Sequence, residues 1–290
     1  MYRIKAPAST SNLSAGFDVL GLALDIYNRF TVELSDKDML INVEDRFNNE
    51  DNLFLKAYHT GTSHLGISDH IKAVFSYDVP IERGLGSSST LIVGGLMAAS
   101  VLHENRLSKD EIFQLASKIE GHPDNAAPCI YGGFTASSVA DGRYYTQKLQ
   151  IDKDYHFTIF IPDFAVSTAK AREILPSRYE RAAIVHNTAK AIYLIEALRN
   201  GDLKLLKKCY DKDVHEPYRQ NLIDEFAVLK ELFEKDSDGV LFISGSGSTC
   251  FGISRKSASK QLIERINKLK HEWQIKEVNI DHKGVDVDEI

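Results

Sequence analysis

A short loop rich in glycine and serine, Gly84-Leu-Gly-Ser-Ser-Ser89, has a composition that suits phosphate binding. The apolar pattern predicts a strand before it and a helix after it, so backbone N–H groups and the helix dipole can converge there on an anion. A P-loop would place a lysine after its last glycine, whereas Gly86 is followed by three serines. The loop therefore indicates an anion site whose balancing cation comes from elsewhere. Simple capping of the helix by Ser87 or Ser88 is the alternative.

A second polar stretch, Glu120-Gly-His-Pro-Asp-Asn125, lies at the end of one predicted helix and the start of the next. Asp124 or Asn125 could simply cap the second helix. Capping does not account for Glu120 and His122, so this stretch is a second candidate site.

Two further polar segments have ordinary structural explanations when each is taken alone. Ile243-Ser-Gly-Ser-Gly-Ser-Thr249 reads as a turn between two strands, and a flexible hairpin turn would explain it. Residues 7–18 read as a loop rich in Ser, Thr and Asn after a strand, which is typical of a solvated turn. Four such loops in one chain make a shared site more plausible than four unrelated turns.

Length and composition narrow the class of protein. The 290 residues, 43% of them hydrophobic, suit one large domain or two packed lobes, and we favour two lobes. A net charge of -6 without a basic run argues against a nucleic-acid partner. The three scattered cysteines, Cys129, Cys209 and Cys250, indicate neither a disulfide framework nor a zinc site. Since no apolar run reaches the roughly 20 residues of a membrane span and no signal peptide is evident, we expect a cytoplasmic protein without a membrane partner.

The elements that must position these loops follow from hydrophobic periodicity. It predicts strands at 2–6, 21–34, 40–44, 71–77, 134–138, 144–149, 157–161, 240–243, 249–254 and 277–280. It predicts helices at 52–65, after the loop at 79–86, at 108–119 with a capping box and a Gly121 stop, and at 179–199, 203–210, 222–233 and 257–271. Strands and helices mix without steady βαβ alternation, so the class is α+β. Together with the missing third glycine, this order argues against a dinucleotide-dependent oxidoreductase.

In their order along the chain, the loops resemble the motifs of the GHMP kinases, a family of small-molecule kinases. The three family motifs are an N-terminal strand and loop, a central Pro-x-x-x-Gly-Leu-Gly-Ser-Ser phosphate loop and a C-terminal glycine-rich turn. The resemblance extends over essentially the whole chain. It implies a two-lobed fold, with a ribosomal protein S5-like N-terminal domain at 1–150 and a ferredoxin-like α+β domain at 151–290.

Within that family, four segments are similar to those of the homoserine kinase subfamily, at 7–21, 120–128, 167–172 and 215–219. Ser248 departs from the family pattern, which often has proline there, and is expected to loosen the turn without removing a needed side chain. The resemblance implies ATP-dependent, Mg²⁺-assisted phosphorylation of the side-chain hydroxyl of L-homoserine to O-phospho-L-homoserine, in threonine biosynthesis. It also implies that the protein forms a homodimer.

The resemblance assigns roles to individual residues. Ser88 and Glu120 correspond to the Mg²⁺ ligands. Arg172 and Arg219 suit the substrate carboxylate, Asp18 its ammonium group, and Asp124 or Asn12 its hydroxyl. The implied catalytic residues are Asn12, Ser88, Glu120 and Asp124, and the implied substrate residues are Asn12, Asp18, His122, Asp124, Arg172 and Arg219. The implied ATP-binding residues are Asn52, Pro80, Ile81, Glu82, Arg83, Gly84, Leu85, Gly86, Ser87, Ser88 and Ser89, with Phe54 or Tyr77 as candidates beside the adenine.

Several alternatives stay open at this level. Asp124 could act as a general base, or positioning and charge stabilisation could suffice, with the proton passing to the phosphate. A mevalonate- or sugar-type kinase would have no use for a partner to an ammonium group, which argues against it. A non-catalytic ligand sensor on the same scaffold would be expected to have lost a Mg²⁺ ligand, and Ser88 and Glu120 are both present.

Overall fold

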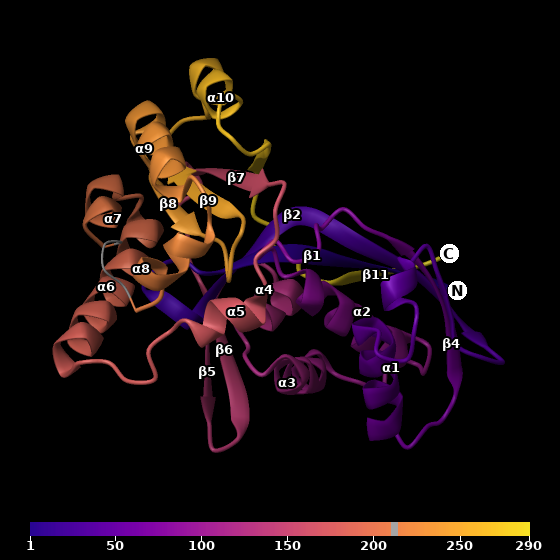
Figure 1. Cartoon of the computed structure of the whole chain (residues 1–290). Coiled ribbons are helices and arrows are strands. Elements are labelled where there is room, and N and C mark those ends of the chain that lie inside the picture. The colour runs from indigo at the N-terminus through magenta and orange to yellow at the C-terminus, as the bar shows by residue number, and fades with distance from the viewer. Residues whose placement is uncertain (210–213) are drawn as a thin grey trace.

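Two β-sheets form the framework of the protein, whose computed structural model describes residues 1–209 and 214–290 (Figure 1). The first sheet has seven strands, with β11, β1, β2, β4 and β3 in that order and β5 and β6 joined at β2. The second has four strands in the order β10-β7-β9-β8. Their bounds are β1 Tyr2–Asn12, β2 Gly16–Ser35, β3 Met39–Ile41, β4 His70–Ser76, β5 Phe134–Ala140, β6 Arg143–Leu149, β7 His156–Pro162, β8 Val240–Ile243, β9 Cys250–Ser254, β10 Trp273–Val278 and β11 Asp286–Glu289.

The helices α1 Leu53–His64, α2 Ser87–Val101, α3 Lys109–Glu120 and α4 Ala126–Tyr131 pack on the first sheet. Three rings, Phe30, Phe54 and Phe75, form the centre of this core, with ring centroids 4.9 to 5.1 Å apart. The predicted capping box at the start of α3 is confirmed. The predicted capping of α2 by a serine is wrong, because the N-cap is Gly86 and no side chain caps the helix.

The second sheet has the βαββαβ arrangement of a ferredoxin-like unit, and all its strand pairs are antiparallel. One face packs on α9 Phe226–Ser237 and α10 Lys260–Ile266, and the other shares a core with β2, α6 Arg181–Asn200 and α7 Leu203–Cys209. The expected α+β class with a ferredoxin-like second half is therefore confirmed. Helix α9 begins four residues later than the predicted helix at 222–233, and α10 is shorter than the predicted helix at 257–271. The end of the predicted helix at 203–210 lies outside the described residues.

The N-terminal polar segment is mostly strand rather than the predicted loop. β1 continues to Asn12 and β2 begins at Gly16, so only residues 13–15 turn. The polar residues of β1 are buried but are hydrogen-bonded within the protein, since Ser9 N donates to Leu85 O and its hydroxyl donates to Asn125 Oδ1. Sequence periodicity missed this because the partners that satisfy these groups lie far away in the chain.

Three elements were not predicted: α5 Thr168–Glu173, α8 Glu216–Arg219 and the last strand, β11. β11 pairs with β1, so the first sheet uses both ends of the chain and the two termini lie close together (Figure 1). The division of the chain at residue 150 stays a prediction. Across the described ranges, no helix combines the length and apolar character that crossing a membrane requires.

Candidate active site

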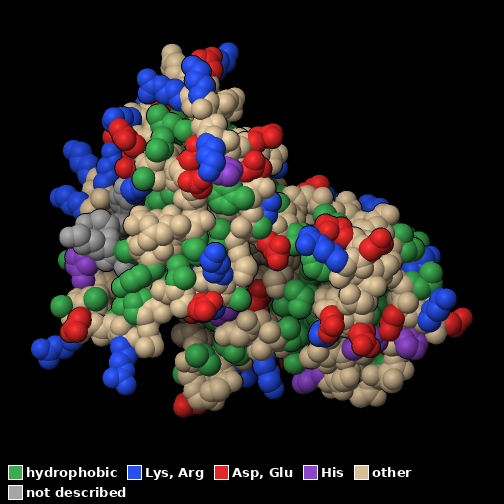
Figure 2. Space-filling view, viewed as in Figure 1, with side chains coloured by type: hydrophobic (Ala, Val, Ile, Leu, Met, Phe, Trp, Pro, Cys, Tyr) green, Lys and Arg blue, Asp and Glu red, His purple; other side chains and the backbone are tan. Residues whose placement is uncertain are grey.

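A cleft of about 700 Å³ opens where the four polar segments meet. It is bordered by the end of β1, the loop before α2, the segment between α3 and α4, and the turn between β8 and β9. Figure 2 shows acidic and basic side chains gathered beside the hollow between the two lobes. Segments that lie far apart in the sequence therefore contribute to one site.

The phosphate loop is held by the glycine-rich turn of the other sheet. Ser244 Oγ donates a hydrogen bond of 2.6 Å to Gly84 O, and Thr249 N donates one of 3.1 Å to Arg83 O. Gly84 has φ +71°, and a Cβ there would lie 2.2 Å from Ser244 O. Only glycine allows this approach of two backbones, so the turn at 243–249 does more than join two strands.

Gly86 allows a similarly close approach between the phosphate loop and β1. Its φ is +68°, and a Cβ there would lie 2.2 Å from Ser9 Oγ. No side chain caps α2, so the first backbone N–H groups of this helix are left for another acceptor, which suits an anion.

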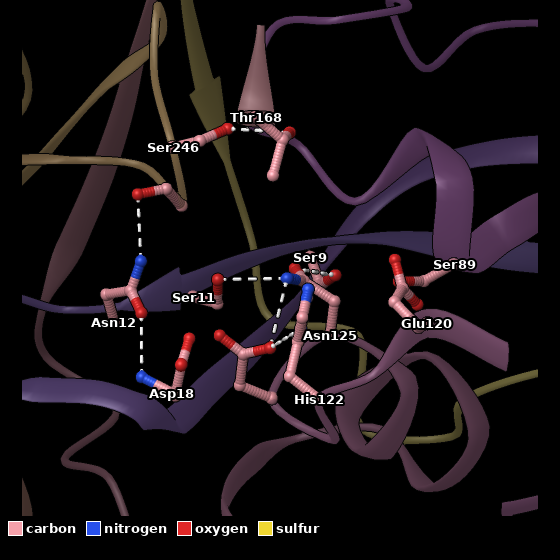
Figure 3. A network of polar contacts seen from close by, with 12 residues as sticks. Ser9, Ser11, Asn12, Asp18, Ser89, Glu120, His122, Asn125, Thr168 and Ser246 are labelled. Carbon is pink, nitrogen blue, oxygen red and sulfur yellow. Dashed lines mark hydrogen bonds and ion pairs between the residues drawn. The ribbon is translucent and has the colours of Figure 1, made fainter. Parts of the chain in front are cut away.

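Glu120, at the end of α3, faces the first turn of α2. Ser89 Oγ donates a hydrogen bond of 2.5 Å to Glu120 Oε2 (Figure 3). The Ser88 hydroxyl is also near enough to favour the charged form of this carboxylate. Burial raises the pKa of Glu120, because neither the serine hydroxyls nor the nearby His122 ring offsets the cost of removing the charged carboxylate from water.

A cation would fit beside Glu120, since a partly buried carboxylate flanked by hydroxyl groups supplies the oxygen ligands that Mg²⁺ takes. Within residues 1–209 and 214–290, no group of three or more His, Cys, Asp or Glu side chains is arranged to hold a metal ion. An ion at Glu120 would therefore need oxygens from serine, water or a phosphate to complete its coordination.

His122, Asp124 and Asn125 line the cleft and form a hydrogen-bonded network (Figure 3). The ring Nδ1 of His122 lies 2.6 Å from Asp124 Oδ1. Burial opposes the charged imidazole, but the Asp124 carboxylate outweighs it and raises the pKa of His122. Asn125 donates to Ser11 Oγ at 2.9 Å and accepts from Ser9 Oγ at 2.8 Å, so it does not cap α4. The network ties the segment at 120–125 to β1.

Asp18 and Arg172 form a two-pronged ion pair across the cleft, with N–O distances of 2.8 and 3.1 Å. Both side chains are a little more than one-third exposed. The two residues expected to face opposite ends of a substrate thus bind each other here. The Asp18 amide also donates to Asn12 Oδ1, and Asn12 Nδ2 donates to Gly245 O, so the Asn12 amide is engaged by the backbone on both sides.

Arg219 lines the inner end of the cleft and is buried, with 2% of its surface exposed. Its Nε donates to Ala171 O and its Nη1 to Gly245 O, both at 3.0 Å, and the guanidinium lies 5.1 Å from the centre of the Phe17 ring. His215 supports this arrangement, because its Nε2 lies 2.9 Å from Ser14 O and its ring stacks on Phe17.

The expected ATP-binding residues divide between the cleft wall and the core. Leu85 is a core residue, Ser89 is buried against Glu120, and Phe54 belongs to the aromatic core, whereas Tyr77 lines the cleft. Asn52 lines the cleft too, but its side chain also caps α1. The wall includes Asn52, Ile81, Glu82, Arg83, Gly84, Gly86, Ser87 and Ser88, and does not include Pro80.

Some lining residues were missed by the sequence reasoning. Thr168 and Ser246 line the site, and their hydroxyls lie 3.2 Å apart. Arg46 and Phe47 line the end beyond Asn52. Thr168 and Ser246 belong to segments that the sequence had singled out, at 167–172 and 243–249, but no role was assigned to them. Arg46 and Phe47 lie in no motif and are brought to the cleft by the fold. Ser248, which was expected to loosen its turn, is buried and donates to Phe164 O at 2.5 Å.

Comparison with known proteins identifies the same arrangement elsewhere. The sequence matches the family model of the GHMP kinases N terminal domain over residues 52–133 and that of the GHMP kinases C terminal domain over residues 194–271. It is 36% identical to curated proteins named homoserine kinase from Clostridium botulinum (strain 657 / Type Ba4) and from Clostridium kluyveri. In both cases the match covers 98% of this chain and 97% of the relative.

Solved structures agree with the sequence relatives. The crystal structure of homoserine kinase from Cytophaga hutchinsonii is similar with a TM-score of 0.85 and 27% identity, covering 99% of this chain and 96% of that one. A putative homoserine kinase from Listeria monocytogenes is similar with a TM-score of 0.84 and 25% identity over the whole of both chains. A mevalonate kinase, at 17% identity and a TM-score of 0.74, shares the fold.

Proposed function

The chain belongs to the GHMP kinase family, and from that premise we propose that it is a homoserine kinase. It transfers the γ-phosphoryl group of ATP to the side-chain hydroxyl of L-homoserine and forms ADP and O-phospho-L-homoserine, a step toward threonine. The observation that carries the proposal is that the phosphate loop and the Asp18–Arg172 pair open on one cleft. A substrate with both an ammonium and a carboxylate group matches that pair. We expect the reaction in the cytoplasm, where ATP is supplied.

The backbone of residues 84–88 cradles the triphosphate in this proposal. No side chain caps the N–H groups of the α2 N-terminus, and the dipole of a 15-residue helix favours negative charge there. The adenine would lie toward Tyr77, Asn52 and Leu53, which line the same cleft. Phe54 takes no part, because it is enclosed in the aromatic core.

Ser88 and Glu120 would hold Mg²⁺, which supplies positive charge to the β- and γ-phosphate oxygens when bound. The metal ion would thus supply the positive charge that a P-loop obtains from its lysine. The burial that raises the pKa of the Glu120 carboxylate also favours a cation there, because an ion of opposite charge offsets the cost of burying a negative group.

Homoserine binds by replacing the ion pair between Asp18 and Arg172 with one ion pair to each of these residues. Its ammonium group takes the Asp18 carboxylate and its carboxylate takes the Arg172 guanidinium, so each charge of the pair keeps an opposite charge. Arg219, at the inner end of the cleft, adds positive charge beside the carboxylate. A substrate with only one of these charges would leave either Asp18 or Arg172 without compensation.

The substrate hydroxyl is directed by Asp124, which His122 and Asn125 hold in place. As the new O–P bond forms, the bond from the γ-phosphorus to the β–γ bridging oxygen breaks and ADP leaves. The hydroxyl proton passes to the transferred phosphoryl group. Positioning and charge stabilisation supply the acceleration, as expected for a loose transition state.

The test is ADP release from MgATP in the presence of homoserine, mevalonate, galactose or shikimate, each alone. Turnover is expected with homoserine, and the Glu120→Gln variant serves as the inactive control. Robust turnover with another compound of the panel in place of homoserine would contradict the substrate assignment. Absence of turnover with all four would favour a ligand sensor.

A further inference from the structure

Phe17, at the start of β2, contacts both arginines that border the cleft. The guanidinium of Arg219 lies over the phenyl ring, 5.1 Å from its centroid, and that of Arg172 lies 5.9 Å from the same centroid. Arg172 belongs to α5 and Arg219 to α8. The ring of His215, which precedes α8, stacks on Phe17 with 5.3 Å between the ring centroids. One aromatic side chain therefore contacts groups from two separate elements.

The two short helices are also tied to each other at this point. Arg219 Nε donates a hydrogen bond of 3.0 Å to the backbone oxygen of Ala171, the residue before Arg172. The helices α5 and α8 accordingly lie close together in Figure 1. Phe17 and Asp18 are neighbours in β2 and both contact this junction, Asp18 through its ion pair with Arg172 and Phe17 through its ring.

The ring of Phe17 attracts both guanidinium groups without neutralising either. The face of a phenyl ring carries partial negative charge and attracts a cation within about 6 Å of its centroid, and both groups lie in that range. Phe17 is half-buried and is not part of the cleft wall, whereas Arg172 and Arg219 are. Any effect of Phe17 on a ligand is therefore transmitted by the arginines.

This ring contact is compatible with a bound substrate, unlike the ion pair. When the ammonium group of homoserine takes the Asp18 carboxylate, Arg172 gives up the two hydrogen bonds that hold it in the unliganded protein. A cation–π contact requires none of the N–H donors of a guanidinium, so it leaves them for a carboxylate. Phe17 can therefore keep Arg172 in place while its hydrogen-bond partner changes.

We propose that Phe17 is a positioning residue that holds Arg172 and Arg219 together as one binding site for the carboxylate of the substrate. Asp18 is the partner of Arg172 that the substrate displaces, and Phe17 is the partner that stays. The inference rests on the proposed function and deepens it, because it assigns the recognition of the carboxylate in part to a side chain outside the cleft wall.

Phe17→Leu tests the proposal, since it removes the ring and keeps an apolar side chain. In assays of ADP release, the KM for homoserine should rise about 3- to 30-fold, the range expected when cation–π contacts are lost at a partly buried site. The kcat and the KM for ATP should stay near their wild-type values, because neither arginine is proposed to hold ATP. The matched control is Phe164→Leu, at a half-buried ring that contacts His271 and Trp273 and does not line the cleft. This control should leave the homoserine KM unchanged.

A series of fluorinated rings tests the electrostatic part of the proposal while keeping the shape of the side chain. Mono-, di- and trifluorinated phenylalanine, introduced at position 17 alone, withdraw increasing electron density from the ring face and weaken its attraction for cations. The homoserine KM should rise stepwise along the series, with kcat nearly constant. The same series at Phe164 should give no trend. These variants also decide the matter if Phe17→Leu does not fold.

The outcomes separate this inference from the proposed function. If the wild type phosphorylates homoserine and the homoserine KM is the same across the fluorinated series at Phe17, the inference is overturned and the proposed function stands. A fall in melting temperature along that series without a change in KM also overturns it, because the ring then has only a structural role, as does an equal trend at Phe164. A wild type that releases no ADP with homoserine overturns the proposed function, and the role of Phe17 with it.

Discussion

Replacing Arg172 with alanine should separate substrate binding from stability. Arg172 binds Asp18 through two hydrogen bonds of 2.8 and 3.1 Å, and both side chains are more than one-third exposed. An ion pair with that exposure contributes about 0.2–1 kcal/mol to stability. The loss of Arg172 should therefore change the free energy of unfolding by no more than about 1 kcal/mol.

The effect on homoserine binding should be larger. A hydrogen bond to a charged group is worth about 1.5–3 kcal/mol, and the wild type spends up to about 1 kcal/mol of this in opening the pair with Asp18. The net loss is about 0.5–2.8 kcal/mol, which corresponds to a roughly 2- to 100-fold increase in the KM for homoserine. The KM for ATP should stay near its wild-type value, because Arg172 is not among the residues proposed to hold ATP.

The assay is initial-rate ADP release with homoserine varied at saturating MgATP, together with urea unfolding. Arg143→Ala is the matched control, because Arg143 forms an ion pair of 2.6 Å with Asp110 that is 54% exposed on both sides. The control should reproduce the small change in stability and leave both KM values unchanged. An unchanged homoserine KM in Arg172→Ala, or an equal rise in the KM for ATP, would refute the reasoning.

Four other perturbations have defined outcomes. Gly84→Ala should destabilise the fold by at least about 2 kcal/mol in urea unfolding, since it adds a backbone clash to a strained φ; Gly142→Ala, at φ +72° with open space around it, should cost about 1 kcal/mol. An equal cost at both sites would show that the clash is relieved elsewhere. Glu120→Gln should lower kcat/KM by roughly 100-fold or more and weaken the dependence on Mg²⁺ concentration, and an unaltered Mg²⁺ titration would count against its role as a ligand. Asp124→Asn should raise the homoserine KM at least as much as it lowers kcat, whereas a collapse of kcat at constant KM would favour a general base. The raised pKa of His122 means that its ion pair stabilises the fold fully below about pH 6.5 and loses this effect as the pH rises through the folded-state pKa. The difference in unfolding free energy between wild type and His122→Gln should therefore shrink from acid to alkaline pH, and a difference that grows with pH would contradict the assignment.

Local sequence determined those features whose physical cause lies within a few residues. The capping box from Ser108 to Glu111 is one case, because both of its hydrogen bonds join residues three apart. The phosphate loop is another, since glycine at positions 84 and 86 permits the positive φ that the junction between loop and helix requires. Motif order along the chain then identified the family and, with it, the expected α+β fold.

Other features depended on contacts between distant residues, and local patterns could not predict them. The serines of β1 looked like a solvated loop because Asn125, which satisfies Ser9 and Ser11, lies more than 100 positions away. β11 escaped prediction because its few residues become a strand only by pairing with β1.

The clearest case is Asp18 and Arg172, which are 154 residues apart. The family resemblance predicted from sequence that this carboxylate and this guanidinium would face a zwitterionic substrate. Tertiary structure decided that they neutralise each other across the cleft, because folding brings the start of β2 and the helix α5 to within hydrogen-bonding distance. A charge left alone in a partly buried site is costly, so the fold pairs the two groups until a ligand offers each a replacement.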